Sequence, residues 1–450
     1  MVSLDAALEH VKHEVGGLLD AETIYASCAT HEYEWKAGGP LDPAATVGLM
    51  LRQVAAGNVA GSAVVRMAGG AFTESAWCRA RQRLPLAVLE DAAAGIAARV
   101  REAAGTRADW QWRGRRVRLV DASNFSMPDS AELRAHFGDV PGQKPGCGFP
   151  IAHCLLVFGM DGGELGYWDA SPKDTGDLAN TPAAHAAAIQ PGDVLLGDDA
   201  FGAYVHLALL RGRGADGVFP AHHARTMDFT PGRPGGPGAA KGAPSSRWVE
   251  SLGHDDQVVE WFKPKQRPAW MTAEQFAAVP ASMLVREVRR TVYRKGFRPM
   301  VVVVATTLLD AAAFPADEVV ALRLRRWDVE TDIRHLKTTM NMEVLRTETV
   351  AGVMKELAAF AVVYNLVRLV MADAARRQGV SPRRLSFADA LAWVRHAEPG
   401  HEPPVLKVVP DRPGRVEPRA VKRRPKPFDL MNRPRSEMRK SIMDKHKAPT

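Results

Sequence analysis

The sequence predicts an α/β protein in which a mixed sheet with flanking helices follows a helical N-terminal region. Residues 1 to about 105 are rich in Ala and Leu and contain few β-branched runs, which is typical of helices. From about residue 115, apolar runs bounded by turn residues indicate strands that alternate with helices. A break rich in Gly and Pro then precedes further strand-like segments, which we interpret as a β-rich insertion.

The predicted layer has the order β-β-β-α-β-α-β, which is typical of a mixed sheet. Each strand is a short apolar or alternating run, and two of them run directly into aspartates. The expected elements are strands at 116–120, 149–160, 164–169, 193–197 and 216–220 and a helix at 201–210.

The insertion contains a segment that regular structure cannot accommodate. Residues 230–244 contain nine Gly or Pro among fifteen residues, which predicts a mobile loop. Strand-like segments follow at 248–262, 283–290 and 300–308, and we expect the last of them to return to the core.

Two long helices are expected after the insertion, at 315–340 and, largely apolar, at 353–378. Asp317 and Glu318 suit the first turn of the earlier helix, because acidic side chains are favourable at a helix N-terminus.

The excess of positive charge lies in the last fifty residues. Residues 401–450 hold 14 Lys or Arg and 6 Asp or Glu, whereas the first 400 residues hold 45 of each kind. Pro and Arg dominate this tail, so we expect it to be extended or disordered until it binds a partner. A basic tail on a neutral body indicates a polyanion, with nucleic acid ahead of an anionic membrane.

The composition argues against a secreted or membrane protein. The four cysteines form no C-x-x-C pair and no zinc spacing, which argues against a structural metal or a disulfide framework. The N-terminus lacks a signal-peptide pattern, and no uninterrupted apolar run of about 18 residues occurs. We therefore expect a cytoplasmic protein with no membrane span.

One face of the helix expected at 315–340 combines cations with an aromatic ring. Measured from Glu330, its members lie at −7, −4, −3, +4 and +7, on one side of a 3.6-residue helix. They are Arg323, Arg326, Trp327, Arg334 and Lys337. Because one carboxylate cannot balance four cations, this face requires an external anion, and an indole beside Arg and Lys suits a displaced base and its phosphates. The alternative is an ordinary solvated face with i,i+4 ion pairs. The neighbouring face is apolar and anchors the helix: Leu322, Val329, Ile333, Leu336 and Met340.

Two predicted strands run into aspartates that could join Glu330. Asp121 follows Leu119 and Val120, and Asp198 follows the strand at 193–197, so both carboxylates are expected at the rim of the sheet. With Glu330 above that rim, the three could hold two Mg²⁺ ions for an in-line displacement at a phosphodiester. Taken singly, each aspartate is more often a turn or cap residue.

The helix face resembles a known signature. Its spacing matches the Y-x2-R-x3-E-x6-K pattern of DDE transposases from bacterial insertion sequences of the IS-4 type, with Arg326, Glu330 and Lys337 at the R, E and K positions. Arg323 stands at the tyrosine position. The similarity extends over about residues 70–450.

Both aspartate regions are also similar to that family. The block 120–138 resembles the region of its first aspartate and 192–202 that of its second, where Asp199 replaces the usual Arg. The family pattern favours Asp198 as the metal ligand, with Asp199 as the alternative. Three separated acidic blocks in the family's order make the resemblance specific.

The resemblance implies an RNase H-like transposase that binds terminal inverted repeats and catalyses metal-dependent cleavage and strand transfer of DNA. Asp121, Asp198 and Glu330 would be catalytic and would bind Mg²⁺, for which Mn²⁺ may substitute. The implied partners are the transposon ends, the target DNA and a second copy of the chain in a synaptic homodimer, with no membrane, at the nucleoid. The expected DNA contacts are Arg323, Arg326, Trp327, Arg334 and Lys337 on the helix and Lys422, Arg423 and Arg424 in the tail.

Five parts follow from the expected elements and the resemblance taken together. They are a helical N-terminal DNA-binding domain (1–108), an RNase H-like catalytic core (109–221 and 309–345), the β-rich insertion (222–308, its end returning to the core), a C-terminal helical region (346–400) and the basic Pro-rich tail (401–450).

Two other functions remain open on the sequence. The replacements at 199 and 323 also suit a transposase-derived protein that binds specific DNA sequences but no longer cuts them. A glycosidase with paired carboxylates is the other alternative, and it leaves the cationic helix face and the basic tail unexplained.

Overall fold

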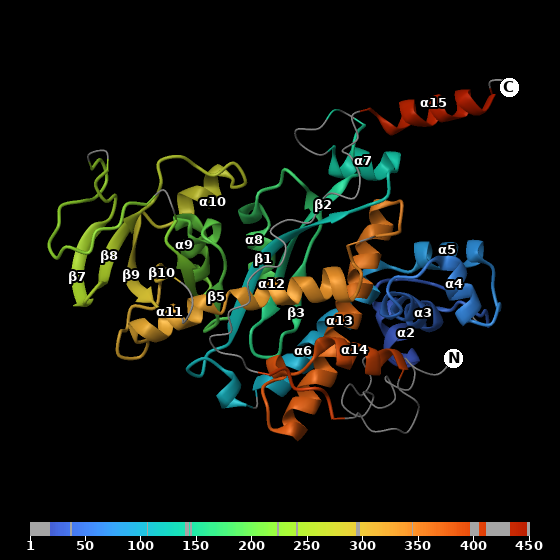
Figure 1. The fold of residues 1–450 in the computed structure, drawn as a ribbon, viewed down its shortest axis with the longest axis horizontal. Coiled ribbons are helices and arrows are strands. Elements are labelled where there is room, and N and C mark those ends of the chain that lie inside the picture. Colours follow the sequence, from blue (N-terminus) through green and yellow to red (C-terminus); the bar gives the residue numbers. More distant parts are fainter. Residues whose placement is uncertain are drawn as a thin grey trace.

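The N-terminal helices gather at one end of the molecule and the outer strands at the other, with the middle of the sheet between them (Figure 1). The computed structural model describes residues 19–36, 38–105, 107–139, 144, 146–222, 225–239, 242–293, 298–343, 345–396, 405–410 and 433–447.

The N-terminal region is helical, as predicted. Its described helices are α2 (Ala21–Thr30), α3 (Pro43–Ala55), α4 (Gly61–Met67), α5 (Glu74–Arg83) and α6 (Leu86–Gly105). Asp20, Asp42 and Thr73 begin three of them, because each side chain accepts a hydrogen bond from a first-turn backbone N–H.

Ten strands form one mixed sheet, which confirms the predicted α/β class. The strands are β1 (Val117–Ser126), β2 (Ile151–Gly159), β3 (Leu165–Trp168), β4 (Ser171–Pro172), β5 (Val194–Leu196), β6 (Asp216–Pro220), β7 (Arg247–Gly253), β8 (Asp256–Phe262), β9 (Ser282–Val292) and β10 (Met300–Thr306). Their order is β3-β2-β1-β5-β6-β10-β9-β8-β7, with β4 beside β2. The pairs β1–β5 and β5–β6 are parallel and the others are antiparallel.

The strands of the insertion extend this sheet. The segment predicted as strand-like at 248–262 is a hairpin of β7 and β8, which turns at Asp255 in a left-handed backbone conformation. β10 then pairs with β6 and carries β9, β8 and β7 outward as further strands.

The loop at 230–244 has no regular structure in its described part, as predicted, but it is anchored. Arg233 is 6% exposed, and its guanidinium donates to the carbonyls of Asp228 and Ser246 and to the Ser246 hydroxyl. A buried cation with three acceptors holds the loop against the strands.

Residues alternate between two cores on the two faces of the sheet. On β2, Cys154, Leu156 and Phe158 face one core, and Leu155 and Val157 face the other. The first core receives α6, α11 (Ala316–Leu324), α12 (Trp327–Arg334) and α13 (Val350–Gln378), and the second receives α8 (Thr181–Ala188) and α9 (Tyr204–Gly212). Asp121 shares the face of Leu119, which is the face that α12 covers.

α13 is the helix that the sequence predicts at 353–378. It is the one described helix that is long and apolar enough to cross a membrane, and 94% of its most apolar window is buried inside the protein. It packs against α6, α3 and α14 (Phe387–His396), so its hydrophobicity belongs to the core.

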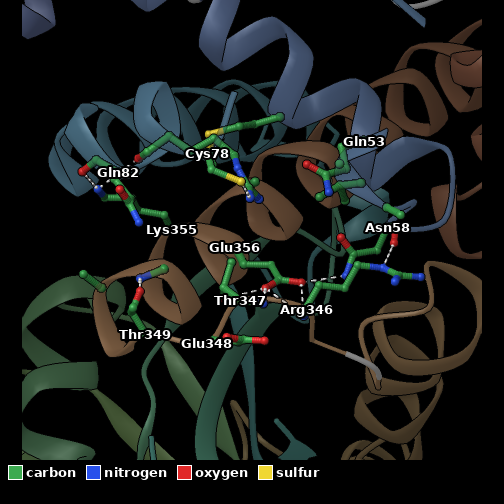
Figure 2. Close-up of a pocket in the computed structure, with 18 of the residues that line it drawn as sticks. Gln53, Asn58, Cys78, Gln82, Arg346, Thr347, Glu348, Thr349, Lys355 and Glu356 are labelled. Atoms are coloured by element: carbon green, nitrogen blue, oxygen red, sulfur yellow. Dashed lines mark hydrogen bonds between the residues drawn. The ribbon is translucent and has the colours of Figure 1, made fainter. Parts of the chain in front are cut away.

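Two buried side chains of α13 tie it to the N-terminal helices (Figure 2). Lys355 donates to the Arg81 and Gln82 carbonyls at the end of α5, over 3.1 and 2.6 Å. The Glu356 carboxylate accepts from the Asn58 amide at 2.6 Å and from the backbone N–H groups of residues 346 and 347. A cavity of about 780 Å³ lies at this joint.

Two parts of the tail expected at 401–450 lie among the described residues, 405–410 and 433–447, and the second is largely helical rather than extended. Leu406 is buried and exchanges two hydrogen bonds with Gln378, so residues 405–410 lie on the body. Residues Arg435–Lys447 form a helix, α15, because this stretch contains no Pro. Arg435 anchors α15 by stacking on Phe149, 3.5 Å from the ring centroid. Lys422, Arg423 and Arg424 lie outside the described residues.

Candidate active site

Asp121 and Asp198 lie at the same end of β5. β1 and β5 pair only through residues 117–119 and 194–196, and each aspartate is two residues beyond its last paired position. The prediction that Asp121 ends a strand is wrong, because β1 continues to Ser126 by pairing with β2. The carboxylate is nevertheless at a rim, since the neighbouring strand on the β5 side has ended.

A buried ionic network fixes the two strands that carry these aspartates. Arg118 of β1 donates to Asp193, which precedes β5, at 3.0 Å and to Glu164, which precedes β3, at 2.6 Å. Gly197 leads from β5 to Asp198 in a space that excludes a side chain, since a Cβ there would lie 2.7 Å from the Phe201 ring. Both features hold the Asp198 loop close to β1.

Asp121 sits in an unfavourable environment for its negative charge. Burial, and to a smaller extent the neighbouring Asp198 and Glu330 carboxylates, raise the pKa of its carboxyl to about 6. The Ala122 backbone N–H, which donates to Asp121 at 2.8 Å, and the Arg326 guanidinium oppose this pKa shift in part. Asp121 therefore interacts electrostatically with both of the other predicted carboxylates.

Asp198 has two further acidic neighbours. Burial raises the pKa of Asp198, as do Asp177 and Asp199, while the Ala200 backbone N–H, donating at 3.0 Å, counteracts the shift. Asp177 is paired with His153 at 2.8 Å between Nε2 and Oδ1. Asp177 belongs to no recognisable motif, so the sequence did not predict it.

The helix predicted as continuous over 315–340 is broken near Arg325. α11 ends at Leu324 and α12 begins at Trp327, and the residues between them make tight i→i−3 hydrogen bonds. A π-helical segment, His335–Thr339, follows α12. The predicted helix is thus divided into three consecutive segments, with Arg323 on α11, Arg326 directly before α12 and Lys337 in the π-helical segment.

Arg326 lies between two of the carboxylates. Its Nη2 is 2.7 Å from Glu330 Oε1 and its Nη1 is 3.4 Å from Asp121 Oδ2. The guanidinium thus acts as a counter-ion to both. The prediction that the helix cations require an external anion is wrong for this arginine, because two carboxylates of the chain balance it.

Arg323 interacts electrostatically with Asp198 and Asp199. Burial and the nearby Arg326 lower the pKa of Arg323 to about 10, while Asp198 and Asp199 act in the opposite direction. Arg323 is therefore a cation placed beside the second aspartate region. It comes from a helix more than a hundred residues further along the chain.

The other three predicted DNA-contacting residues of this helix region differ in their exposure and in their contacts. Trp327 is 64% exposed, so its indole is available to an external partner. Arg334 is exposed and forms no ion pair with the described residues. Lys337 donates to the Asn124 carbonyl at 3.0 Å and lies 5.3 Å from the Phe125 ring centroid.

The opposite side of α12 carries a buried aspartate, Asp332, that was not predicted from the sequence. Asp332 is 0% exposed and binds Arg368 of α13 and Arg383 of the turn that follows it. An acidic residue that interrupts the apolar face of Val329 and Ile333 was the available signal. This ion triad fixes α12, and with it Glu330, against α13.

The donor chemistry of the acidic cluster suits a hard divalent cation. Carboxylate oxygens are the ligands that Mg²⁺ prefers, and a cation would offset both the burial of the Asp121 charge, which chiefly raises the pKa of this carboxyl, and the charge of its acidic neighbours. Among the described residues, no three His, Cys, Asp or Glu side chains converge closely enough to enclose an ion. The Arg326 guanidinium instead lies between Asp121 and Glu330, and the carboxylates would close on a cation as it withdraws.

The comparison with protein families covers this region. The model of the family described as "Transposase DDE domain" matches residues 112–366, more than half of the chain. The chain belongs to the DDE transposase family. Asp121, Asp198 and Glu330 of this family member all lie within the matched region. DDE transposases generally use divalent metals such as Mg²⁺.

A curated relative supports the IS-4 type. The chain is 31% identical over 197 residues to the transposase InsG for insertion sequence element IS4 of Escherichia coli (strain K12). The match covers 39% of this transposase-family chain and 42% of that relative, so it spans less than half of either protein.

Proposed function

We propose that this DDE transposase cuts DNA at the ends of a transposon and joins it to a target, with Asp121, Asp198 and Glu330 as the catalytic, metal-binding residues. The observation that carries the proposal is the position of Asp121 on β1, where it shares Arg326 with Glu330 of α12 and lies near Asp198 of the loop after β5. Mg²⁺ is the proposed ion, with Mn²⁺ as a substitute. When bound, such ions activate the attacking oxygen and stabilise the leaving oxygen of the phosphodiester.

The neighbouring side chains have proposed roles in holding DNA. Trp327 offers an exposed indole on which a displaced base can stack, and Arg334, at the other end of α12, offers a cation without an ion pair among the described residues. Arg326, now paired with Asp121 and Glu330, would be available to a phosphate if a cation neutralised these carboxylates. Lys337, beside Asn124, holds a second phosphate.

The replacements at 199 and 323 compensate one another. The family pattern puts an arginine at 199 and a tyrosine at 323, whereas this chain has Asp199 and Arg323. The electrostatic influence of Asp198 and Asp199 on Arg323 supports a cation retained beside the second aspartate, supplied from α11. This exchange favours an active enzyme over a DNA-binding protein that has lost cleavage.

Binding to two ends further implies a synaptic homodimer, since two equivalent DNA ends are processed symmetrically. The tail residues Lys422, Arg423 and Arg424 are proposed to add contacts to phosphates that do not depend on sequence. The cytoplasmic nucleoid is the proposed location, because the substrate is chromosomal DNA.

Cleavage of a labelled duplex that carries the ends flanking the gene tests the proposal. We expect nicking at the ends with Mg²⁺, none with EDTA, and none from Glu330→Gln, which keeps the size of the side chain but removes its charge. Thr331→Val, next to Glu330, is the matched control and should cut normally. End binding without cleavage under Mg²⁺ or Mn²⁺ would support the inactive DNA-binding protein instead.

A further inference from the structure

A second hollow lies on the N-terminal helices, apart from the carboxylates. It has a volume of about 630 Å³ and lies between residues 33–41 and α5. Its lining includes the aromatic rings of Tyr33, Trp35 and Phe72. Trp35 stacks on Tyr33, with ring centroids 6.4 Å apart, and on Tyr25, which is not part of the lining, at 5.0 Å. We call this hollow the aromatic groove.

Two arginines at the aromatic groove have no counter-ion among the described residues. Arg79 and Arg83 are exposed, line the groove and lie one turn apart on α5. Like charges at this spacing repel, which costs the helix a few tenths of a kcal/mol unless an anion binds. Lys36 adds a third cation, and Glu34 is the one acidic side chain among the described lining residues.

We propose that the aromatic groove binds one unpaired nucleotide of the DNA substrate, with its base against the aromatic wall and its flanking phosphates on Arg79 and Arg83. This inference rests on the proposed function, because it assumes that the chain handles DNA. Bases stack well on aromatic side chains whatever their identity, and arginines one turn apart can contact consecutive phosphates.

The shape and chemistry of the groove favour an unpaired nucleotide over a duplex. In a duplex the base faces are covered by neighbouring pairs, so a duplex would reach the arginines at the rim and leave the hollow unfilled. A free inorganic anion would use the arginines but would make no use of Tyr33, Trp35 and Phe72. An extruded or single-stranded nucleotide uses both features.

The test compares binding of a labelled single-stranded oligonucleotide with binding of the blunt duplex of the same sequence, using the full chain. For Arg79→Ala/Arg83→Ala we expect roughly tenfold weaker binding of the single strand, a change of less than about threefold for the duplex, and a salt slope smaller by about 1.4. The matched control is Arg99→Ala/Arg107→Ala, which removes two N-terminal arginines paired with Glu102 and Asp109.

The aromatic wall is tested separately. Trp35→Ala should lose single-strand affinity, whereas Trp35→Phe should retain most of it at an unchanged melting temperature. Equal loss for duplex and single strand in the arginine variant, or no loss for either, would overturn the inference while the Mg²⁺-dependent cleavage of the ends could still stand. If the intact chain bound no DNA of any kind, the proposed function would fail with it.

Discussion

Arg383 donates to both carboxylate oxygens of Asp332, over 3.1 and 2.9 Å. Arg368 donates to the same carboxylate from α13. Asp332 lies two residues after Glu330 and points to the opposite side of α12, so the placement of the proposed metal ligand depends on an ion triad behind it. Burial of charged groups is tolerated here because each has a partner.

Asp332→Ala should lower the free energy of unfolding by about 3–5 kcal/mol, because two buried arginines would lose their shared carboxylate. Asp328→Ala, on the same helix, removes a partly exposed partner of Arg325 and should cost less than about 1 kcal/mol. Urea denaturation of both variants measures the difference. Equal stability of the two would show that the triad does not stabilise the fold.

Asp121→Asn should stabilise the metal-free protein, and increasingly so as the pH rises. The folded pKa of Asp121, about 6, lies above its ordinary value of 3.8, so the native state holds a proton that the unfolded chain releases between these values. That contribution to stability is present below about pH 4 and is lost as the pH rises through 6. Asparagine does not ionise, so the variant does not undergo this loss of stability as the pH rises.

Melting temperatures of both proteins in EDTA, from pH 4 to pH 7.5, check this. Asp161, whose pKa is raised to about 7 chiefly by burial, titrates in both proteins and cancels in the comparison. Parallel curves for the two proteins would contradict the assigned environment of Asp121.

Asp199 and Arg323 should be coupled in a double-mutant cycle of end cleavage. Asp199→Arg alone brings a cation beside Arg323, and Arg323→Tyr alone leaves Asp198 and Asp199 without that arginine, so each single change should slow cleavage. The double variant restores the family pattern and should cut faster than the product of the single effects predicts. Independent effects would refute compensation.

The ligand at the second aspartate can be assigned with alanine variants. Asp198→Ala should reduce cleavage by more than about a hundredfold, whereas Asp199→Ala should keep it within about tenfold. The reverse order would make Asp199 the ligand.

Trp327→Ala should leave the melting temperature nearly unchanged and still reduce end cleavage roughly tenfold or more, because the exposed indole contributes to DNA contact rather than to the core. Tyr293→Ala is the matched control. Tyr293 directly follows β9 and is 76% exposed, and its loss should have little effect on end cleavage. A similar loss in both variants would argue against a specific stacking role.

Neutralising Lys422, Arg423 and Arg424 to Gln should weaken binding to all DNA sequences alike and reduce the salt slope by up to about 2.7 on duplex DNA. Arg99→Gln/Arg107→Gln/Arg376→Gln removes the same charge from ion-paired surface positions and is the control. Truncation experiments should begin after residue 410, because Leu406 is part of the folded body. An unchanged slope would exclude phosphate contacts by the tail.

Apolar periodicity was sufficient to predict α13 and most of the strands, because burial on a sheet face or in a core demands it, but it did not predict β4 and gave β7 and β8 as one segment. It could not predict that β1 extends to Ser126, since residues 121–126 are polar and their strand conformation comes from pairing with β2. The break near Arg325 was not predicted either, because the local sequence favours a continuous helix over 315–340.

The residue types of the candidate site could be read from spacing, but their pairing could not. Nothing in the sequence shows that Arg326 serves Asp121 as well as Glu330, since this depends on how α12 crosses β1. The role of Asp332 needed a three-dimensional view for the same reason, as its arginines lie 36 and 51 residues further along the chain.

Because β10 pairs with β6, strands β9, β8 and β7 extend the sheet in one direction only. Among the described residues, β7 is therefore the edge strand on that side. A ladder of this kind can lengthen at its margin one hairpin at a time, since a new strand needs hydrogen bonds only from its immediate neighbour. Lineages of this fold could therefore enlarge or trim the surface beyond β7 while the strands that bear Asp121 and Asp198 keep their partners. The edge of the sheet at β7 can therefore change, whereas the central strands next to the candidate active site cannot.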